Sequence, residues 1–124
     1  MNLLRFLVSS LSGVLLVGTV VAGGAAQVPV TRCGWFSNPT PANAWLVDRE
    51  AEWTIGTQGG AQAEGDWPRF KSSQWVQTNG HYGYGCACMS VVADAETHEV
   101  SVIKAAHAQS LSVCRKDRSL KAPQ

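Results

Sequence analysis

Apolar and polar side chains alternate over several short stretches of the chain, with turn-forming residues between them. Alternation of this kind is typical of β-strands that bury one face. The stretches expected to form strands are Arg32–Phe36, Ala44–Val47, Glu52–Thr57, Tyr82–Val92 and Glu99–Ala106. Asp48–Ala51 carries residue types of a tight turn, so Ala44–Val47 and Glu52–Thr57 should pair as an antiparallel hairpin. Asn79-Gly80 is a turn signal ahead of the central strand, and Asp94–His98 should form a polar turn between the last two strands.

The segments outside these strands complete the expected fold. Phe70–Trp75 should form a short helical turn between the two hairpins, with Ser72 or Ser73 near its cap, and Leu111–Cys114 should dock the C-terminal segment. The chain shows no internal repeat. The pattern therefore predicts a mainly β fold, with α+β as the alternative, built on a small antiparallel sheet of about four to five strands.

One stretch, Asn79–Cys88, stands out because glycine alternates with bulky residues in it. Gly83 and Gly85 alternate with Tyr82 and Tyr84, so a strand here has one bare face and one aromatic face. A bare face lets a backbone, a ring or a ligand approach closely. We expect one of the five tryptophans to cover it, in preference to a ligand groove.

The four cysteines suggest a covalent frame. Cys86 and Cys88 lie two positions apart, and a bond between them would close a short, strained ring. Each should therefore pair with one of the distant cysteines, Cys33 or Cys114. Two connectivities remain open: 33–86 with 88–114, or 33–88 with 86–114. Either one ties both ends of the domain to its central strand.

Residues 1–26 have the features of a secretory signal peptide. Arg5 is followed by an apolar run from Phe6 to Val21, and Gly24-Ala25-Ala26 supplies small residues, so we expect cleavage after Ala26. An uncleaved membrane anchor is the alternative, but the run is shorter than the roughly 20 apolar residues that span a bilayer. Residues 27–124 should then form one small disulfide-stabilised domain with a frayed C-terminal tail, without a stable membrane span.

Composition narrows the functional classes. Ten basic residues, one of them Arg5, oppose nine acidic residues, so no electrostatic footprint for nucleic acid is expected. An even cysteine count after a signal peptide favours disulfides in a periplasmic or secreted protein. A zinc site is disfavoured because the close pair has Cys-x-Cys spacing, and no metal or other cofactor is expected.

Amides and aromatic residues provide the candidate binding surface. Such side chains suit a sugar or a protein partner, because rings stack and amides fix orientation. The candidate residues are Asn43, Trp45, Asp48, Gln58, Asn79, Tyr82 and Tyr84. The asparagines could instead satisfy turns through bonds to the backbone. A hydrolase using Asp48 or His81 and a structural envelope protein without a pocket are alternatives, and no catalytic motif with its mechanical context is present.

The chain also resembles a known family. The residues that carry the resemblance are Arg32–Phe36, Asn38–Asn43, Trp45-Leu46, Asp48-Arg49, Trp53, Gln58–Gly60, Thr78–Gly80, Tyr82–Cys88 and Cys114–Asp117. Together they resemble the bacterial domain of unknown function family 4087, across essentially all of residues 27–124. The resemblance implies a small exported bacterial protein and brings no assigned reaction. His81 departs from the small polar residue expected there, which weakens a catalytic role for it. We therefore favour a small binding or inhibitor-type module for a cell-envelope or extracellular protein or glycan over an enzyme.

Overall fold

The structure, a computed structural model, describes residues 13, 15–19 and 27–124 of the chain. The signal peptide predicted over residues 1–26, including its cleavage after Ala26, therefore lies mostly outside the described residues. Residues 13 and 15–19 carry no regular secondary structure. Within the described ranges, no helix is long and apolar enough to cross a membrane.

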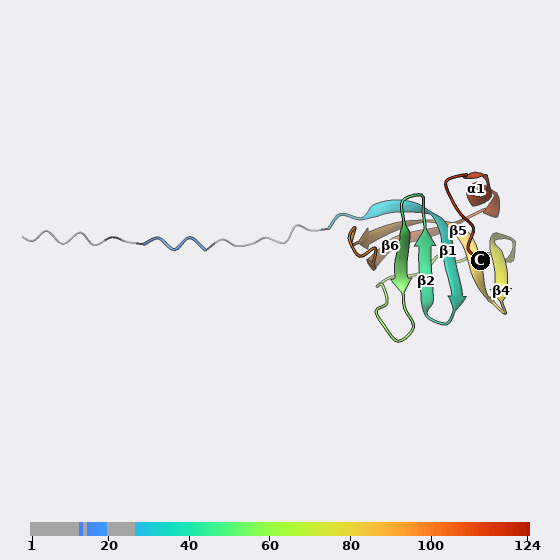
Figure 1. The fold of residues 1–124 in the computed structure, drawn as a ribbon, viewed down its shortest axis with the longest axis horizontal. Helices are drawn as coiled ribbons and strands as arrows, with labels where there is room; N and C mark the ends of the chain where they lie inside the picture. Colours follow the sequence, from blue (N-terminus) through green and yellow to red (C-terminus); the bar gives the residue numbers. More distant parts are fainter. Residues whose placement is uncertain (1–12, 14, 20–26) are drawn as a thin grey trace, which may run out of the picture.

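The fold is mainly β, as the sequence predicts (Figure 1). Its strands are β1 (Val30–Thr40), β2 (Asn43–Val47), β3 (Glu52–Gly56), β4 (Trp75–Asn79), β5 (Tyr82–Ala93) and β6 (Val100–Gln109). A 3₁₀ turn, η1 (Ser72–Gln74), precedes β4, and a short helix, α1 (Leu111–Lys116), follows β6.

All six strands belong to one antiparallel sheet, in the order β3-β2-β1-β5-β4, with β6 also paired to β5. The long β5 accommodates two neighbours along the edge opposite β1. Its first residues, Tyr82–Gly85, pair with β4, and the residues from Cys86 onward pair with β6. The turn predicted at Asp48–Ala51 joins β2 to β3, and the turn predicted at Asn79-Gly80 joins β4 to β5, with Gly80 at a φ of 58°.

The sheet curls until its two ends meet (Figure 1). The Thr54 N–H of β3 donates to the His98 carbonyl beside β6 at 2.8 Å. Nearby, the segment 61–64 lies between the two strands. The Ala63 N–H donates to the Ile55 carbonyl at 2.8 Å, and the Glu64 N–H donates to the Ser101 carbonyl at 3.0 Å. This closure satisfies backbone groups that two open sheet edges would leave unpaired.

The inside of the curl holds the main hydrophobic core. Phe36, Leu46, Trp53, Ile55 and Met89 are almost fully buried there. They come from four strands, and their positions alternate with outward-facing residues, as the period of two requires. Each such side chain contributes roughly 1.5–3 kcal/mol through burial.

The outer face carries a second, smaller core and both disulfides. The register of β1 and β5 sets Cys33 directly opposite Cys88 and Trp35 opposite Cys86. The disulfides are accordingly Cys33–Cys88 and Cys86–Cys114, which decides between the two predicted connectivities. Cys114 lies on α1, so this bridge fixes the helix over Trp35.

The structure has one strand more than the predicted four to five. The additional strand is β4, which begins at Trp75, the residue at which the expected helical turn ends. That turn, predicted over Phe70–Trp75, is reduced to η1. The reason is the Asn79-Gly80 turn itself, because it folds the preceding residues back onto β5. Leu111–Cys114 docks as predicted, in the form of α1, and Leu120 of the tail packs beside it on the outer core.

Candidate functional site

The glycine face of β5 lies on the inside of the curled sheet, between β1 and β4. Cross-strand pairing places Gly85 between Phe36 of β1 and Trp75 of β4. One pair further along, Gly83 lies between Asn38 and Gln77. A row of aromatic rings and a row of amides thus run side by side, with no β5 side chain separating their members.

The aromatic row gathers two more rings from the loop before β4. The ring centre of the buried Phe36 lies 5.5 Å from that of Trp67 and 5.8 Å from that of Phe70. Phe70 and Trp75 are 4.9 Å apart. Phe70 occupies the space over Gly85, since a Cβ there would lie 2.5 Å from its ring. The predicted ring over the bare face is therefore present, but it is a phenylalanine and not a tryptophan.

These residues line a hollow of about 350 Å³, which we call the aromatic hollow. Its walls are Phe36, Trp67, Phe70 and Trp75, and its rim carries the polar groups of Asn38, Lys71, Ser72, Gln77 and His81. The Trp75 indole N–H donates to the His81 carbonyl at 3.0 Å, which fixes the orientation of that ring. Hollows of this size that combine apolar walls with a few polar groups are typical of small-ligand sites.

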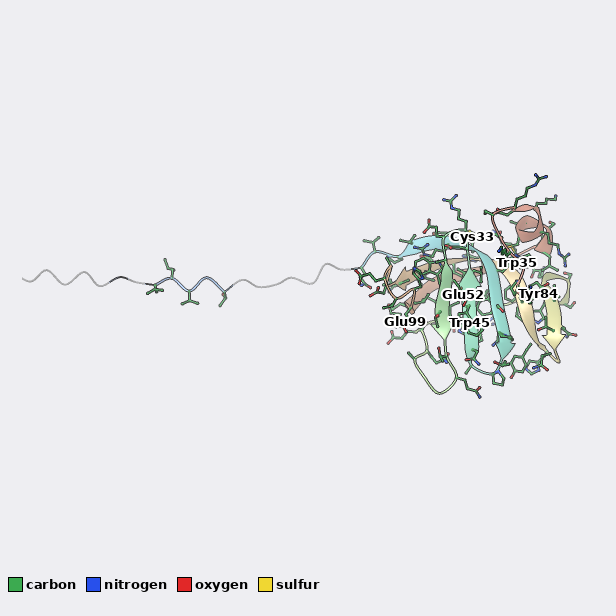
Figure 2. All side chains as sticks on the ribbon, viewed as in Figure 1. Cys33, Trp35, Trp45, Glu52, Tyr84 and Glu99 are labelled. Atoms are coloured by element: carbon green, nitrogen blue, oxygen red, sulfur yellow. A yellow bond between two sulfur atoms is a disulfide. The ribbon has the colours of Figure 1, made fainter. Side chains whose placement is uncertain are left out.

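Two of the predicted binding residues lie on the other side of the sheet. Trp45 is paired with Ser37, and Ser37 with Tyr84, so the backbones of Trp45 and Tyr84 lie two strand spacings, or about 10 Å, apart. Figure 2 labels both residues together with Trp35, which the register of β1 and β5 places on the same face. Tyr84 packs edge-on against the buried Trp35, with ring centres 5.2 Å apart. Trp45 and Tyr84 are each half-buried on this face.

The predicted amides lie near the turns at one end of the sheet. The Asn43 side chain accepts a hydrogen bond from the Gln58 N–H at 2.8 Å and donates to Thr40 Oγ1 at 2.7 Å. Asn79 pairs with Tyr82 across the β4–β5 hairpin. The structure thus brings Asn43 and Gln58 together, and the bonds of Asn43 stabilise the turns, as the alternative interpretation of the asparagines predicts.

Asp48 lies apart from these residues, in an ion-pair cluster. Its carboxylate accepts hydrogen bonds from the Glu50 and Ala51 N–H groups at 2.8 and 2.9 Å and from the Arg32 guanidinium at 3.0 Å. Arg32 also contacts Glu50 at 2.9 Å and lies 3.6 Å above the Trp53 ring. Asp48 therefore connects the β2–β3 turn to β1.

The charges in this cluster stabilise one another. Burial alone would raise the pKa of Asp48, but the hydrogen bonds from the N–H groups of Ala51 and Glu50 and from the Arg32 guanidinium hold it below its usual value. Burial would likewise lower the pKa of Arg32, yet its bonds to Glu50 and Asp48 raise it. Asp48 is thus a charged carboxylate that accepts hydrogen bonds from three residues, Arg32, Glu50 and Ala51, which suits a structural anchor.

Sequence reasoning missed the residues that form the aromatic hollow. Phe36, Trp67, Phe70 and Trp75 come from β1, the loop before η1, and β4, and their meeting depends on pairing over long sequence distances. The one available signal was the Gly83/Gly85 alternation, which indicates that something large covers that face. Across the described residues, no group of three or more His, Cys, Asp or Glu side chains is placed to hold a metal ion.

Comparison with known proteins gives one match. A family model described as "Protein of unknown function (DUF4087)" covers residues 27–121. No curated protein and no solved structure matches the chain.

Proposed function

The chain belongs to the DUF4087 family, and from this premise we propose that it is a small exported binding module whose aromatic hollow takes a sugar ring of a cell-envelope or extracellular glycan. Two disulfides are consistent with a periplasmic or extracellular location. The observation that carries the proposal is the pair of neighbouring rows in the hollow, one of aromatic rings and one of amides. In each row a glycine of β5 lies between the β1 and β4 residues.

A pyranose ring matches both rows. Its C–H face packs on aromatic rings, and its hydroxyl groups accept and donate hydrogen bonds as side-chain amides do. Trp67 and Trp75 are half-buried, so each still presents part of its ring to a ligand. Gln77 is exposed beside these rings, where its amide can fix the orientation of a stacked sugar. The Asn38 side-chain amide already donates to the Thr40 and Asn43 carbonyls at 2.9 and 2.7 Å, so its carbonyl oxygen is the group that can accept a hydrogen bond from a sugar hydroxyl.

Binding of the purified protein to envelope and extracellular glycans, measured by calorimetry and by tryptophan fluorescence, tests the proposal. Trp67→Ala should weaken binding about 30-fold or more, the effect of losing a central aromatic contact. Gln77→Ala should weaken it with little effect on folding, because Gln77 is exposed. Trp45→Ala is the matched control, since it removes a half-buried tryptophan from the outer face.

The remaining predicted residues define the competing site. If Trp45→Ala and Tyr84→Ala abolish binding while Trp67→Ala does not, the ligand lies on the outer face and the aromatic hollow is not the site. If the purified protein retains another protein but no glycan, the ligand is a protein partner and not a sugar. No binding of either kind would favour a structural envelope protein. Asp48 is engaged in its turn, and no observation favours a hydrolase.

A further inference from the structure

Strand β6 loses its outer neighbour halfway along its length. The segment 61–64 pairs with it through two bonds, from the Glu64 N–H to the Ser101 carbonyl at 3.0 Å and from the Ile103 N–H to the Glu64 carbonyl at 2.7 Å. The chain then leaves the strand at Gly65, where φ is 102°. Among the described residues, no segment pairs with that edge of β6 beyond Ile103, although β6 continues to Gln109.

A hollow of about 770 Å³ lies where the neighbouring strand would continue. One wall is β6 from Ile103 to Ala108, and the other is the loop from Gly65 to Lys71, with Gln74 beyond it. We call this space the β6 groove. It is separate from the aromatic hollow, although Trp67 and Lys71 contribute to both.

The charges of the β6 groove are mostly positive. Arg69 and Lys71 line it from the loop and Lys104 from the strand, against the single carboxylate of Asp66. All four side chains are exposed. A lysine on an open edge can by itself discourage strand-to-strand aggregation. That role does not require two further cations on the facing loop, which would instead attract an anionic ligand lying in the groove.

We propose that the β6 groove binds an extended peptide with acidic side chains, which adds as a strand along residues 104–108 of β6. Main-chain hydrogen bonds to the open edge supply affinity, as in other cases of strand addition, and the cations select for glutamate or aspartate. Five residues of strand span about 17 Å, so a short linear segment of a partner protein is long enough. This site goes beyond the glycan site proposed above.

The test uses a labelled synthetic peptide that alternates valine with glutamate, and the full protein. Fluorescence anisotropy should show binding that weakens as salt rises. Amide signals of residues 104–108 should shift in NMR spectra and exchange more slowly with solvent. A peptide alternating valine with lysine should not bind. Lys104→Glu should lower the affinity at least tenfold, while Lys121→Glu, an exposed charge reversal outside the groove, should not.

Backbone recognition is checked with the same acidic peptide N-methylated at alternate residues. Loss of its binding supports strand addition, whereas equal affinity overturns it. If the protein dimerises through residues 104–108 and takes up no peptide, a second copy of the chain is the occupant and the proposal is overturned. The absence of binding at millimolar peptide concentration would also overturn it. Gln77→Ala should leave peptide affinity unchanged, and Lys104→Glu should leave glycan affinity unchanged, so the two sites can fail independently.

Discussion

Removing the buried disulfide gives the sharpest test of how the fold is held together. We consider the double variant Cys86→Ala/Cys114→Ala. The two cysteines are 1% and 3% exposed and pack with Trp35. They are 28 residues apart, so the bridge removes about 3.6 kcal/mol of loop-closure entropy from the unfolded chain at 25 °C. A domain of this size has a free energy of unfolding of roughly 5–15 kcal/mol, so the variant should still fold.

The loss should also have a local signature at α1. The helix has six residues, too few to be stable without tertiary contacts. In the variant, only Leu111 and Leu120 would still hold it against the outer core. We therefore expect trypsin to cleave after Arg115 and Lys116 much faster than in the unchanged protein, while the core strands stay protected.

Urea denaturation followed by tryptophan fluorescence measures the first effect, and timed proteolysis with mass spectrometry measures the second. Ser112→Ala is the control, because Ser112 is an exposed residue of the same helix and its loss should change stability by less than about 0.5 kcal/mol. A loss below about 1 kcal/mol in the double variant, with α1 still protected, would refute the reasoning. Apolar contacts alone would then be sufficient to dock the helix.

Three further predictions concern other parts of the fold. Gly65→Ala should lower the free energy of unfolding by about 2 kcal/mol or more, because Gly65 has a φ of 102° and a Cβ there would meet a carbonyl oxygen of β6. Gly59→Ala is the control and should lower it by only about 1 kcal/mol, because Gly59 has a φ of 75° but open space around it. Equal losses in urea denaturation would contradict this. The lowered pKa of Asp48 contributes stability that is present above the unfolded-state pKa of about 3.9 and lost as pH falls through the folded-state value. Asp48→Asn should therefore be less stable than the unchanged protein at pH 7, and the two should become similar in acid. A difference in denaturation midpoint that does not change with pH would argue against that linkage. Mild reductant should open Cys33–Cys88 first, because Cys33 is exposed, and alkylation with mass spectrometry should find these two thiols labelled before the other pair.

Much of the fold follows from local signals. The alternation in Glu52–Thr57 and Tyr82–Val92 predicted β3 and β5 to within a residue or so, because a half-buried strand imposes a period of two whatever it packs against. Asn79-Gly80 predicted a turn, and one is present, because Gly80 adopts a positive φ, which costs glycine little. β4 was missed because its few residues, Trp75–Asn79, show only a brief alternation next to an apparent helical turn.

The candidate sites depend more heavily on distant pairing. Sequence reasoning grouped Trp45 and Tyr84 with five other candidate binding residues, but it could not bring Phe36 to Trp67 and Phe70, which lie more than 30 positions away. Their contact requires the loop before η1 to fold across the glycine face of β5. The β6 groove likewise exists because the chain leaves the strand at Gly65, and the residues of the loop give no local sign of that departure.

The sequence by itself determined the strands other than β4, the positions of the main turns, and the tying of both ends of the domain to its middle by four cysteines. Periodicity, turn chemistry and short Cys spacing are all local signals that act over a few residues. Tertiary structure alone decided the pairing of those cysteines. In the register of β1 and β5, Cys33 faces Cys88, and Trp35 takes the place opposite Cys86, which leaves Cys86 for α1. A shift of one residue would turn Trp35 and Phe36 to the wrong faces, so burial of these two rings in separate cores fixes the register and, with it, the disulfides.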